Sequence, residues 1–406
     1  MARDRVLPLA GYRVVDITQV WAGPQLCSSM GDMGAEVIRV ESLAGTDIGR
    51  ISSVPKSDFR RFLESQRHSR ARAYCITLNI AEPEGGELFR ELISTTDVFV
   101  CNLSPRVQEK LGIRYEDLRP LRPDLIMATI SAAGHTGPFR ELMAYGPGFN
   151  AFVGHDSLVG YPDTGELMSA YWDPDPAMGV MGFYAVMLAI WHREETGEGQ
   201  HVDLSFSEFL TGLLGEPVLE YQMTGEVPGP QGNLHPSMAP HNIYPSSGDD
   251  SWVSIAVGAD EEWVALCRAM EMPELASDPR FADGALRLEH REELDEIIGR
   301  WTRGRTHNEA MHLLQEVGVA ATPAFNIGEL YHDPHDTYRR TSVPVEAPGL
   351  AKEDVIYGIP WHLSETPGAI QRLGVGMGRD NDVFFSQVLG LPEDRIRDLA
   401  DRQILR

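Results

Sequence analysis

The opening part of the chain alternates short β-rich runs with segments that suit helices. RVVDI at 13–17 precedes the helix-like PQLCSSMGDMGA, and EVIRVE at 36–41 is strand-like again. Helix-like EGGELFRELIST then precedes TDVFVCN, and LRPDLIMATISAAG supplies a further strand. Strands that alternate with helices form βαβ units, whose sheets are parallel. The pattern therefore predicts an α/β fold, with a doubly wound, Rossmann-like parallel sheet in a large domain.

A long apolar segment follows the stretch YWDPDPAMG at 171–179. It is apolar on every face as far as Trp191 and ends at Gly197. A helix that is apolar all round belongs in a core or an interface, so its start is expected to be buried. Asp173 and Asp175 lie at that start. An Asp followed by Pro is also a common helix cap, and capping alone is one interpretation of both carboxylates.

The sequence changes character near Pro228, where Gly, Pro and Ser become frequent. A hairpin is predicted around Gly248–Asp250, and helical patterns follow in DEEWVALCRAM and HREELDEIIGRWT. We expect a smaller α+β domain inserted into the large one. The expected boundaries are 1–205 for the N-terminal part of the large domain, 206–225 for a linker, 226–328 for the small domain and 329–406 for a return segment that completes the large domain.

The charge of the chain limits its partners. Its 60 acidic and 35 basic residues give a net charge of −25, which argues against a nucleic-acid or anionic membrane partner. An anionic ligand must therefore meet a local basic patch. RRFLESQRHSRAR holds five arginines that could bind phosphates, although a solvated surface is an equal alternative: Arg60, Arg61, Arg67, Arg70 and Arg72.

Cysteine and histidine usage gives no sign of a metal site or a disulfide framework. The four cysteines are far apart without C-x-x-C spacing, which fits a reducing cytoplasm. His332 and His335 in YHDPHDTY have no further ligands at recognisable spacing, so a turn is expected there and no metal. The longest apolar run, 177–191, is shorter than the ~20 residues of a membrane span, and no signal-peptide core is present.

A dinucleotide-dependent oxidoreductase is the first enzyme class that the βαβ start suggests. Glu41 ends the second strand, where a ribose-binding acid would lie. The glycine fingerprint is missing, however, because QVWAGPQ has a single Gly in the first turn. The chain also lacks a G-x-S-x-G elbow, a P-loop and H-E-x-x-H.

Several blocks of the sequence resemble one known family. LAGYRVVDITQVWAGPQLCSSMGDMGAEVIRVE is similar to the N-terminal signature of the family III coenzyme A transferases, which include formyl-CoA transferase, carnitine CoA-transferase and α-methylacyl-CoA racemase. The resemblance continues through LNIAEPEGGELFRELISTTDVFVCNLSPRVQEKLGI, DLIMATISAAGHTGP and HREETGEGQHVDLSFSE. It implies an acyl-CoA and a small carboxylic acid as substrates, no tightly bound cofactor, and an obligate homodimer of interlocked subunits.

The resemblance also implies the catalytic residue. In the family a single Asp opens an apolar helix that ends at a T-G-x-G-Q turn and acts as the nucleophile. Counting back from Thr196–Gln200 places that Asp at Asp175, with Gly179 matching a family glycine and Asp173 as second choice. A buried carboxylate at a helix N-terminus is kept ionised yet poorly hydrated, which suits a nucleophile.

The racemase branch of the family is the alternative activity. The resemblance implies that the racemase chemistry uses a His about thirty residues before the Asp. That position is close to Tyr145, a poor base at neutral pH, and His155 lies about ten residues too late. A transferase that uses an aspartyl covalent intermediate is therefore the predicted function.

The coenzyme A contacts follow from the resemblance by position. They fall on nine residues: Val20, Trp21, Ala22, Leu78, Asn102, Leu103, Lys110, Arg70 and Arg72. The two arginines are included because a basic residue that the family places after Glu41 is Ser42 here. LHPSMAPHNIYP has no counterpart of the glycine-rich loop of formyl-CoA transferase, which argues against formate or oxalate. Relatives that share the pattern Tyr-x-Asp-Pro suggest a dicarboxylate such as succinate.

Overall fold

The computed structural model describes residues 7–45, 73–167, 174–344, 355–370 and 376–406. The chain forms two compact units, which are considered separately. The first unit holds 1–155, 169–225 and 340–406, and the second holds 156–168 and 226–339. The small domain predicted at 226–328 falls within the second unit, whose boundary with the last segment lies at 339 instead of 328. Its standing as an independently folded insertion stays a prediction.

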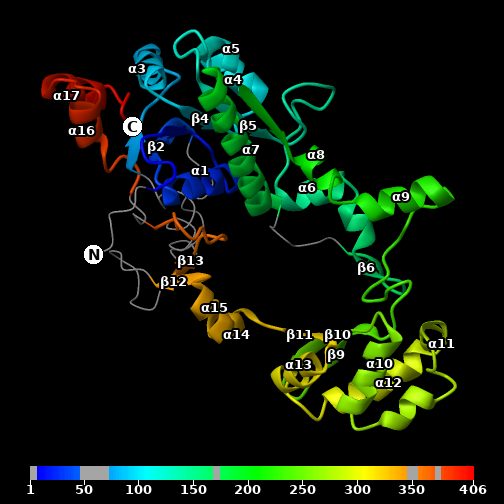
Figure 1. Ribbon diagram of the computed structural model, residues 1–406. Coiled ribbons are helices and arrows are strands. Elements are labelled where there is room, and N and C mark those ends of the chain that lie inside the picture. Colours follow the sequence, from blue (N-terminus) through cyan, green and yellow to red (C-terminus); the bar gives the residue numbers. More distant parts are fainter. Residues whose placement is uncertain (1–6, 46–72, 168–173, 345–354, 371–375) are drawn as a thin grey trace. The chain divides into compact units, whose positions relative to one another are not determined.

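A parallel sheet forms the centre of the first unit (Figure 1). In the described residues it has six strands in the order β3-β2-β1-β4-β5-β8. The strands are β1 (Arg13–Asp16), β2 (Glu36–Glu41), β3 (Tyr74–Thr77), β4 (Val98–Cys101), β5 (Ile126–Ser131) and β8 (His201–Ser205). Each adjacent pair is parallel. The strand order reverses between β1 and β4, which confirms the predicted parallel α/β sheet and creates a switch point.

Helices cover both faces of this sheet. The helices of the first unit are α1 (Ala22–Asp32), α3 (Pro83–Ser94), α4 (Pro105–Leu111), α5 (Tyr115–Leu118), α6 (Gly146–Phe152), α7 (Pro174–Thr196), α8 (Phe206–Thr211), α9 (Gly215–Thr224), α16 (Asn381–Val383) and α17 (Glu393–Asp401). A short ladder pairs β12 (Ser342–Pro344) with β13 (Val355–Tyr357).

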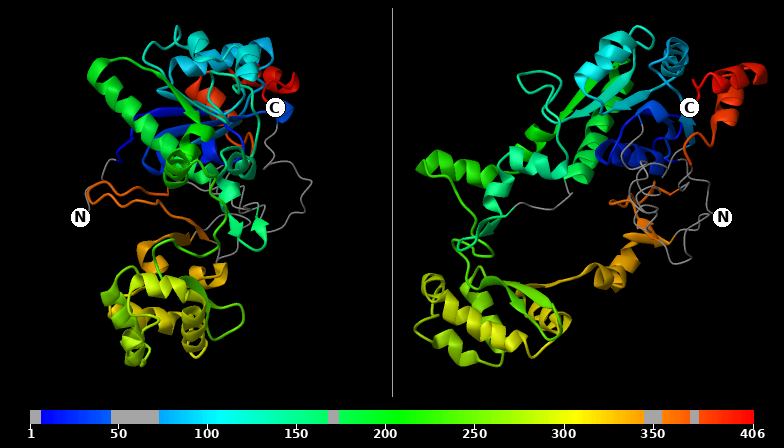
Figure 2. Two further views of the ribbon diagram at one scale, coloured as in Figure 1. Left: turned by 90° about the vertical axis from the view of Figure 1, so that its right-hand side faces the viewer. Right: turned by 180° about the vertical axis from the view of Figure 1, so that it is seen from behind.

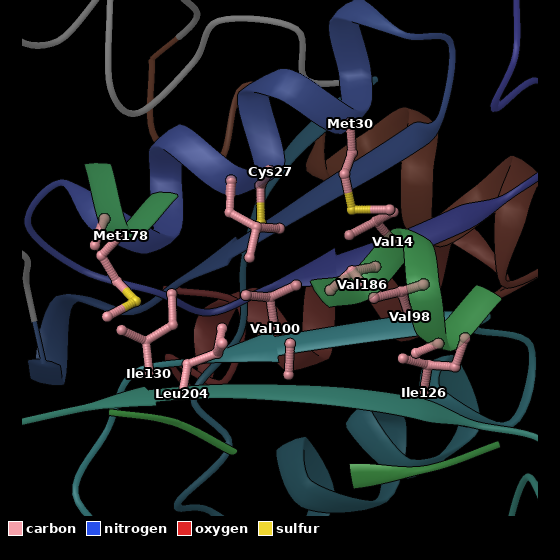
Figure 3. Close-up of a cluster of buried hydrophobic side chains, with 14 of the residues drawn as sticks. Val14, Cys27, Met30, Val98, Val100, Ile126, Ile130, Met178, Val186 and Leu204 are labelled. Atoms are coloured by element: carbon pink, nitrogen blue, oxygen red, sulfur yellow. The ribbon is translucent and has the colours of Figure 1, made fainter. Parts of the chain in front are cut away.

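Alternate residues of each strand supply the two halves of the core, because successive side chains of a strand point to opposite faces. Val14 and Val98 pack against α1 and α7, where they meet Met30 and Val186 (Figure 3). Val15 and Phe99 face the other way, toward α3 and the C-terminal residues. We call the side of the sheet that carries Val14 and Val98 the α1/α7 face, and the side that carries Val15 and Phe99 the α3/α4/α5 face.

The C-terminal segment completes the edge of the sheet at β3. The Cys75 amide donates to Asp380 Oδ2 at 2.9 Å, and the Thr77 amide donates to Asn381 Oδ1 at 2.9 Å. Phe384 and Phe385 are fully buried in the core of the α3/α4/α5 face. The last residues therefore satisfy edge-strand donors and fill the core.

The second unit has its own three-stranded antiparallel sheet (Figure 2), and a separate cluster of buried hydrophobic side chains forms its core. The strands of this sheet are β9 (His241–Pro245), β10 (Trp252–Ala256) and β11 (Ala320–Ala324), and a separate ladder pairs β6 (Gly160–Tyr161) with β7 (Gly165–Glu166). Its helices are α10 (Asp260–Ala269), α11 (Gly284–Glu289), α12 (Arg291–Thr302), α13 (His307–Glu316), α14 (Ile327–Tyr331) and α15 (Pro334–Arg339). The hairpin predicted around Gly248–Asp250 is confirmed, because β9 pairs antiparallel with β10.

Three local features differ from expectation. Segment 206–225, expected as a linker, is helical, and Phe206 and Leu210 of α8 pack into the core of the first unit. The turn at His332 is followed directly by α15, because Asp333 Oδ1 accepts from the amides of His335 and Asp336. Helix α7 is buried on one side only, and Tyr184 and Trp191 on its other side are 58% and 66% exposed.

Candidate active site

A pocket of about 220 Å³ lies at the edge formed by the carboxyl ends of the strands, called the carboxyl edge below. Ligands of open α/β sheets bind at this edge, near the switch point. The described lining comes from the ends of β1, β2 and β3, from α4 and from one C-terminal residue: Ile17, Thr18, Gln19, Arg39, Val40, Glu41, Ser42, Gly45, Leu78, Asn79, Ile80, Ala81, Leu103, Val107, Leu111 and Met377.

A buried ion-pair cluster forms one wall of the pocket. Arg39 is 1% exposed, and its guanidinium lies 3.0 Å from Asp16 Oδ1 and 3.8 Å from Glu41 Oε1. Asp16 Oδ1 also accepts from the amide and hydroxyl of Thr18. A buried charge is tolerated when it is paired in this way, so the cluster holds the end of β1 in one conformation. Sequence reasoning missed Arg39, although one Arg inside the apolar strand EVIRVE is an available signal.

The turn between β1 and α1 carries three of the predicted coenzyme A contacts. Val20 has a φ of +66°, a backbone conformation that a β-branched residue rarely adopts, and Trp21 and Ala22 follow at the start of α1. A side chain on Gly23 would collide with Thr18, so the chain passes very close to itself here. Strained backbone of this kind is found where a ligand or a functional group must be placed.

The other predicted contacts fall into three groups. Leu78 and Leu103 line the pocket, and Asn102 binds the backbone of Gln19. Lys110 is exposed in the last turn of α4, next to the lining residue Leu111. Arg70 and Arg72, like Arg60, Arg61 and Arg67, lie outside the described residues. Arg39 is the basic residue in the described lining of the pocket, and its guanidinium is paired with Asp16 and Glu41.

Asp175 lies in the first turn of α7 and is 6% exposed. Asp173, its predicted rival, lies outside the described residues. The predicted burial of Asp175 is confirmed. The N-terminus of α7 favours the ionised carboxylate through the helix dipole, while the surrounding protein limits its hydration. Such a carboxylate is suited to act as a nucleophile.

Two glycines bring α7 into close contact with α1. A Cβ on Gly179 would lie 2.6 Å from Gln25 Cβ and 2.8 Å from the Ala22 carbonyl oxygen. A Cβ on Gly182 would lie 2.6 Å from Leu26 Cδ1. Because contacts advance together along both helices, α1 and α7 run in the same direction. Both helices therefore begin at the carboxyl edge, and Asp175 lies on the side of that edge where the Val20–Ala22 turn starts α1.

The described residues provide neither an ionised thiol at Cys101 nor a metal centre. Cys101 is fully buried, and burial raises the pKa of its thiol to about 12, so it stays protonated at neutral pH. No group of three or more His, Cys, Asp or Glu in the described part of the chain could hold a metal ion. Among the described helices, none has the length and apolar character needed to cross a membrane.

Comparison with known proteins agrees with the fold. The model of CoA-transferase family III matches residues 9–381. Succinyl-CoA–D-citramalate CoA-transferase of Chloroflexus aurantiacus is 33% identical over 402 residues, with 98% of each chain covered. Succinate–glutarate CoA-transferase of Agrobacterium fabrum is 30% identical over 383 residues, which cover 92% of this chain and 94% of that protein. The solved structure of a CAIB/BAIF family protein from Brucella suis matches with a TM-score of 0.83 at 26% identity, covering 95% of this chain and 100% of the other. The chain therefore belongs to CoA-transferase family III and is a CoA-transferase with acyl-CoA as a substrate.

Proposed function

We propose that this enzyme transfers coenzyme A from succinyl-CoA to a second small dicarboxylic acid through covalent intermediates on Asp175. The observation that carries the mechanism is the burial of Asp175 at the start of α7, on the carboxyl edge of the sheet. The substrates are suggested by two similar proteins, whose names pair succinyl-CoA with D-citramalate and succinate with glutarate. All of these acids carry two carboxylates.

The reaction proceeds by exchange at carbonyl carbons. The Asp175 carboxylate attacks the thioester carbonyl, the C–S bond breaks, and CoA leaves as a thiolate, so that a mixed anhydride of Asp175 and the donor acid remains. The thiolate attacks the Asp175 carbonyl, which releases the donor acid and leaves an aspartyl-CoA thioester. The acceptor carboxylate then attacks this thioester, the C–S bond breaks, and CoA thiolate is released from a second anhydride that joins Asp175 and the acceptor. The thiolate finally attacks the acceptor carbonyl of this anhydride and displaces the Asp175 carboxylate. The products are the new acyl-CoA and the Asp175 carboxylate, so atoms and charges balance.

The position of Asp175 supports each of these steps. A helix N-terminus favours the negative charge of the attacking carboxylate and of the carboxylate regenerated at the end. Burial keeps water away from the anhydride and thioester, which would otherwise be hydrolysed. Transfer to an acid instead of water requires this exclusion.

The pocket at the carboxyl edge suits the nucleotide end of coenzyme A. The thioester must reach Asp175, on the side where α1 begins, while the pocket opens at the ends of β1, β2 and β3. The pantetheine arm would pass the turn of Val20, Trp21 and Ala22. The phosphates would then meet cations outside the described lining, and Lys110, Arg70 and Arg72 are the predicted ones.

A homodimer is the second part of the proposal. Helix α7 carries an exposed apolar stripe, formed by side chains that are 39% to 66% exposed: Val180, Met181, Tyr184, Leu188 and Trp191. Positions spaced by three and four residues lie on one face of a helix. An apolar stripe of this length on a described surface marks a contact with another molecule, and a second copy of the chain accounts for it. We also propose that the two subunits of this dimer are interlocked. The small domain is proposed to be an insertion in the large one, and the enzyme to act in the cytoplasm.

The racemase alternative has little support at the site. Tyr145, near the position where that chemistry needs a base, precedes α6 and is 59% exposed. A phenol is largely protonated at neutral pH and is a poor general base.

Mass spectrometry of product thioesters tests the proposed reaction. The enzyme is incubated with succinyl-CoA and, separately, with glutarate, citramalate, malate, formate or oxalate. New dicarboxylyl-CoA esters are expected, with little formyl- or oxalyl-CoA. The same reactions in D₂O report on the alternative, because rapid exchange of the α-proton without CoA transfer would contradict the proposal.

Sedimentation velocity tests the dimer. A dimer is expected at micromolar enzyme, and Leu188→Glu together with Trp191→Glu should shift it to monomer. Ile327→Glu is a matched control, because Ile327 is 80% exposed on α14 in the second unit. A wild-type monomer would contradict the proposal.

A further inference from the structure

A cluster of polar side chains lies on the α3/α4/α5 face of the sheet, away from Asp175. It joins Gln108 of α4, Thr129 of β5, His135 after β5, and His201 and Asp203 of β8. Gln108 is 1% exposed and Thr129 is fully buried. These residues come from four separate segments of the chain. The proposed chemistry at Asp175 does not use any of them.

The hydrogen bonds of Gln108 fix the orientation of its amide. Its Nε2 donates to the Leu103 carbonyl oxygen at 2.7 Å and lies 2.8 Å from His135 Nε2. The opposite orientation would place two carbonyl oxygens at hydrogen-bond distance, which is repulsive. One hydrogen of the amide therefore points to Leu103 and the other to His135.

This orientation fixes the tautomer of His135. Since Gln108 donates, His135 Nε2 must be the acceptor, and the ring hydrogen is on Nδ1. His135 Nδ1 lies 3.0 Å from Asp203 Oδ1, and the His135 amide donates to Asp203 Oδ2 at 2.9 Å. Asp203 thus contacts the ring with one carboxylate oxygen and the backbone of His135 with the other, as carboxylates commonly orient imidazoles.

The charge states of the two neighbours agree with this assignment. Burial raises the pKa of Asp203, but hydrogen bonds from the ring and backbone of His135 outweigh it, and the pKa lies below its ordinary value. Asp203 is therefore ionised at neutral pH. Burial lowers the pKa of His201, whose Nε2 lies 2.8 Å from Thr129 Oγ1, so this ring is neutral.

The chain of contacts ends at the wall of the pocket. Leu103, whose carbonyl Gln108 binds, precedes α4 and lines the pocket together with Val107 and Leu111 of α4. We propose that Gln108 and His135 are positioning residues for acyl-CoA: Asp203 orients His135, His135 orients Gln108, and Gln108 holds the Leu103 wall. This inference rests on the proposed use of the pocket for coenzyme A.

Steady-state kinetics and binding of free CoA by calorimetry test the inference. Gln108→Leu and His135→Phe keep the approximate size but remove the hydrogen bonds. Each should raise the KM for acyl-CoA and the Kd for CoA by about tenfold, as the loss of one or two such bonds implies. The kcat and the KM for the acceptor acid should change by less than about twofold, because a positioning effect at the pocket leaves Asp175 in place.

A rescue variant separates positioning from simple loss of stability. His135→Gln puts an amide oxygen near the place of His135 Nε2, where it can accept from Gln108, and should restore most of the affinity for CoA. Gln315→Leu is the matched control, since Gln315 Nε2 donates to the Ala321 carbonyl in the second unit at 3.0 Å. It removes the same kind of bond and should leave the Kd unchanged.

The outcomes distinguish the inference from the proposed function. An unchanged Kd in His135→Phe, or no recovery in His135→Gln, would overturn the positioning role while leaving wild-type CoA transfer intact. A loss of kcat equal to the rise in KM would overturn it as well. If wild-type enzyme bound CoA normally but Leu103→Ala left the Kd unchanged, the pocket would not be the CoA site, and the proposed location of the coenzyme would be wrong.

Discussion

Asn102 and Gln19 are joined by a reciprocal pair of hydrogen bonds. The Gln19 amide donates to Asn102 Oδ1 at 2.8 Å, and Asn102 Nδ2 donates to the Gln19 carbonyl oxygen at 2.7 Å. The residues follow β1 and β4, the two strands between which the sheet order reverses. One side chain therefore ties the turn before α1 to the opposite side of the switch point.

Replacing Asn102 should weaken the binding of acyl-CoA. Asn102→Leu removes both hydrogen bonds and leaves two backbone groups of Gln19 without these partners, at a cost of about 1–3 kcal/mol. The KM for acyl-CoA should rise by about tenfold or more, which corresponds to at least about 1.4 kcal/mol. Asn102→Asp keeps the acceptor oxygen but not the donor, so its KM for acyl-CoA should lie between those of Asn102→Leu and the wild type. Equal KM values for all three enzymes would contradict this account.

The contact between α1 and α7 should be sensitive to one added methyl group at Gly179. A Cβ there meets the Ala22 carbonyl oxygen and Gln25, which cannot move aside easily, so Gly179→Ala should lower the free energy of unfolding by about 1–3 kcal/mol. It should also lower kcat, because Asp175 lies one turn away.

Gly86→Ala is the control for this substitution. In α3 the new Cβ has ordinary contacts at 3.4 Å, so helix propensity should make this variant neutral or more stable by up to about 1 kcal/mol. Urea unfolding of both variants measures the difference. A neutral Gly179→Ala would show that the helices are not packed as described.

Stability should fall on mild acidification because of His201. Burial lowers its pKa in the folded protein, so the unfolded chain takes up a proton first as pH falls below about 6.5, the ordinary value. The stability contributed by the neutral ring is present above this value and declines as pH falls toward the lower, folded pKa. Asp203 contributes at more acidic pH, because its pKa in the folded protein lies below the ordinary value of about 3.9. The stability from its ionised carboxylate is present above that value and is lost as pH falls toward the lower, folded pKa.

Thermal unfolding between pH 7.5 and 5 measures the His201 effect. His201→Gln should flatten the decline of Tm between pH 6.5 and 5, because Gln does not titrate. A decline that is identical in the variant and the wild type would assign this pH dependence to other groups.

The cysteines should be unreactive in the folded enzyme. All four are buried, and burial raises the thiol pKa of Cys101 and Cys267 to about 12. Iodoacetamide at pH 8 should label none of them until denaturant is added, and transfer activity should survive the treatment. Rapid inactivation with label on Cys101 would mean that the core around this residue opens readily.

The strand and helix pattern of the first unit could be predicted from the sequence because local periodicity determines it. EVIRVE became β2 and the apolar run after Asp175 became α7. The sequence did not indicate strand β8, because HVDLS is short and polar. This segment becomes a strand through its parallel pairing with β5. The all-round apolar pattern of α7 predicted burial in a core or an interface, and a single sequence does not show which of these covers each side of the helix.

The candidate site was predictable only where a motif marked it. The resemblance to the family implied Asp175, by counting back from the turn at Thr196–Gln200. The contacts of Asn102 with Gln19 and of His135 with Gln108 join residues that are 83 and 27 positions apart. Such pairings depend on how strands and helices pack, and composition or periodicity carries no signal for them. Arg39 is the exception, because a charged residue inside an apolar strand invites a search for its partners.

Trapping of the acyl-enzyme tests the central claim most directly. The enzyme is incubated with succinyl-CoA and then hydroxylamine, which converts an anhydride or thioester carbonyl to a hydroxamate but leaves ordinary carboxylates unchanged. Peptide mapping should find the hydroxamate on Asp175. Asp175→Asn keeps the size and a capping oxygen of the side chain, so it should fold normally, form no hydroxamate and lose turnover by about three orders of magnitude or more. Asp173→Asn should have a much smaller effect. A hydroxamate on Asp173, or near-normal transfer by Asp175→Asn, would contradict the account.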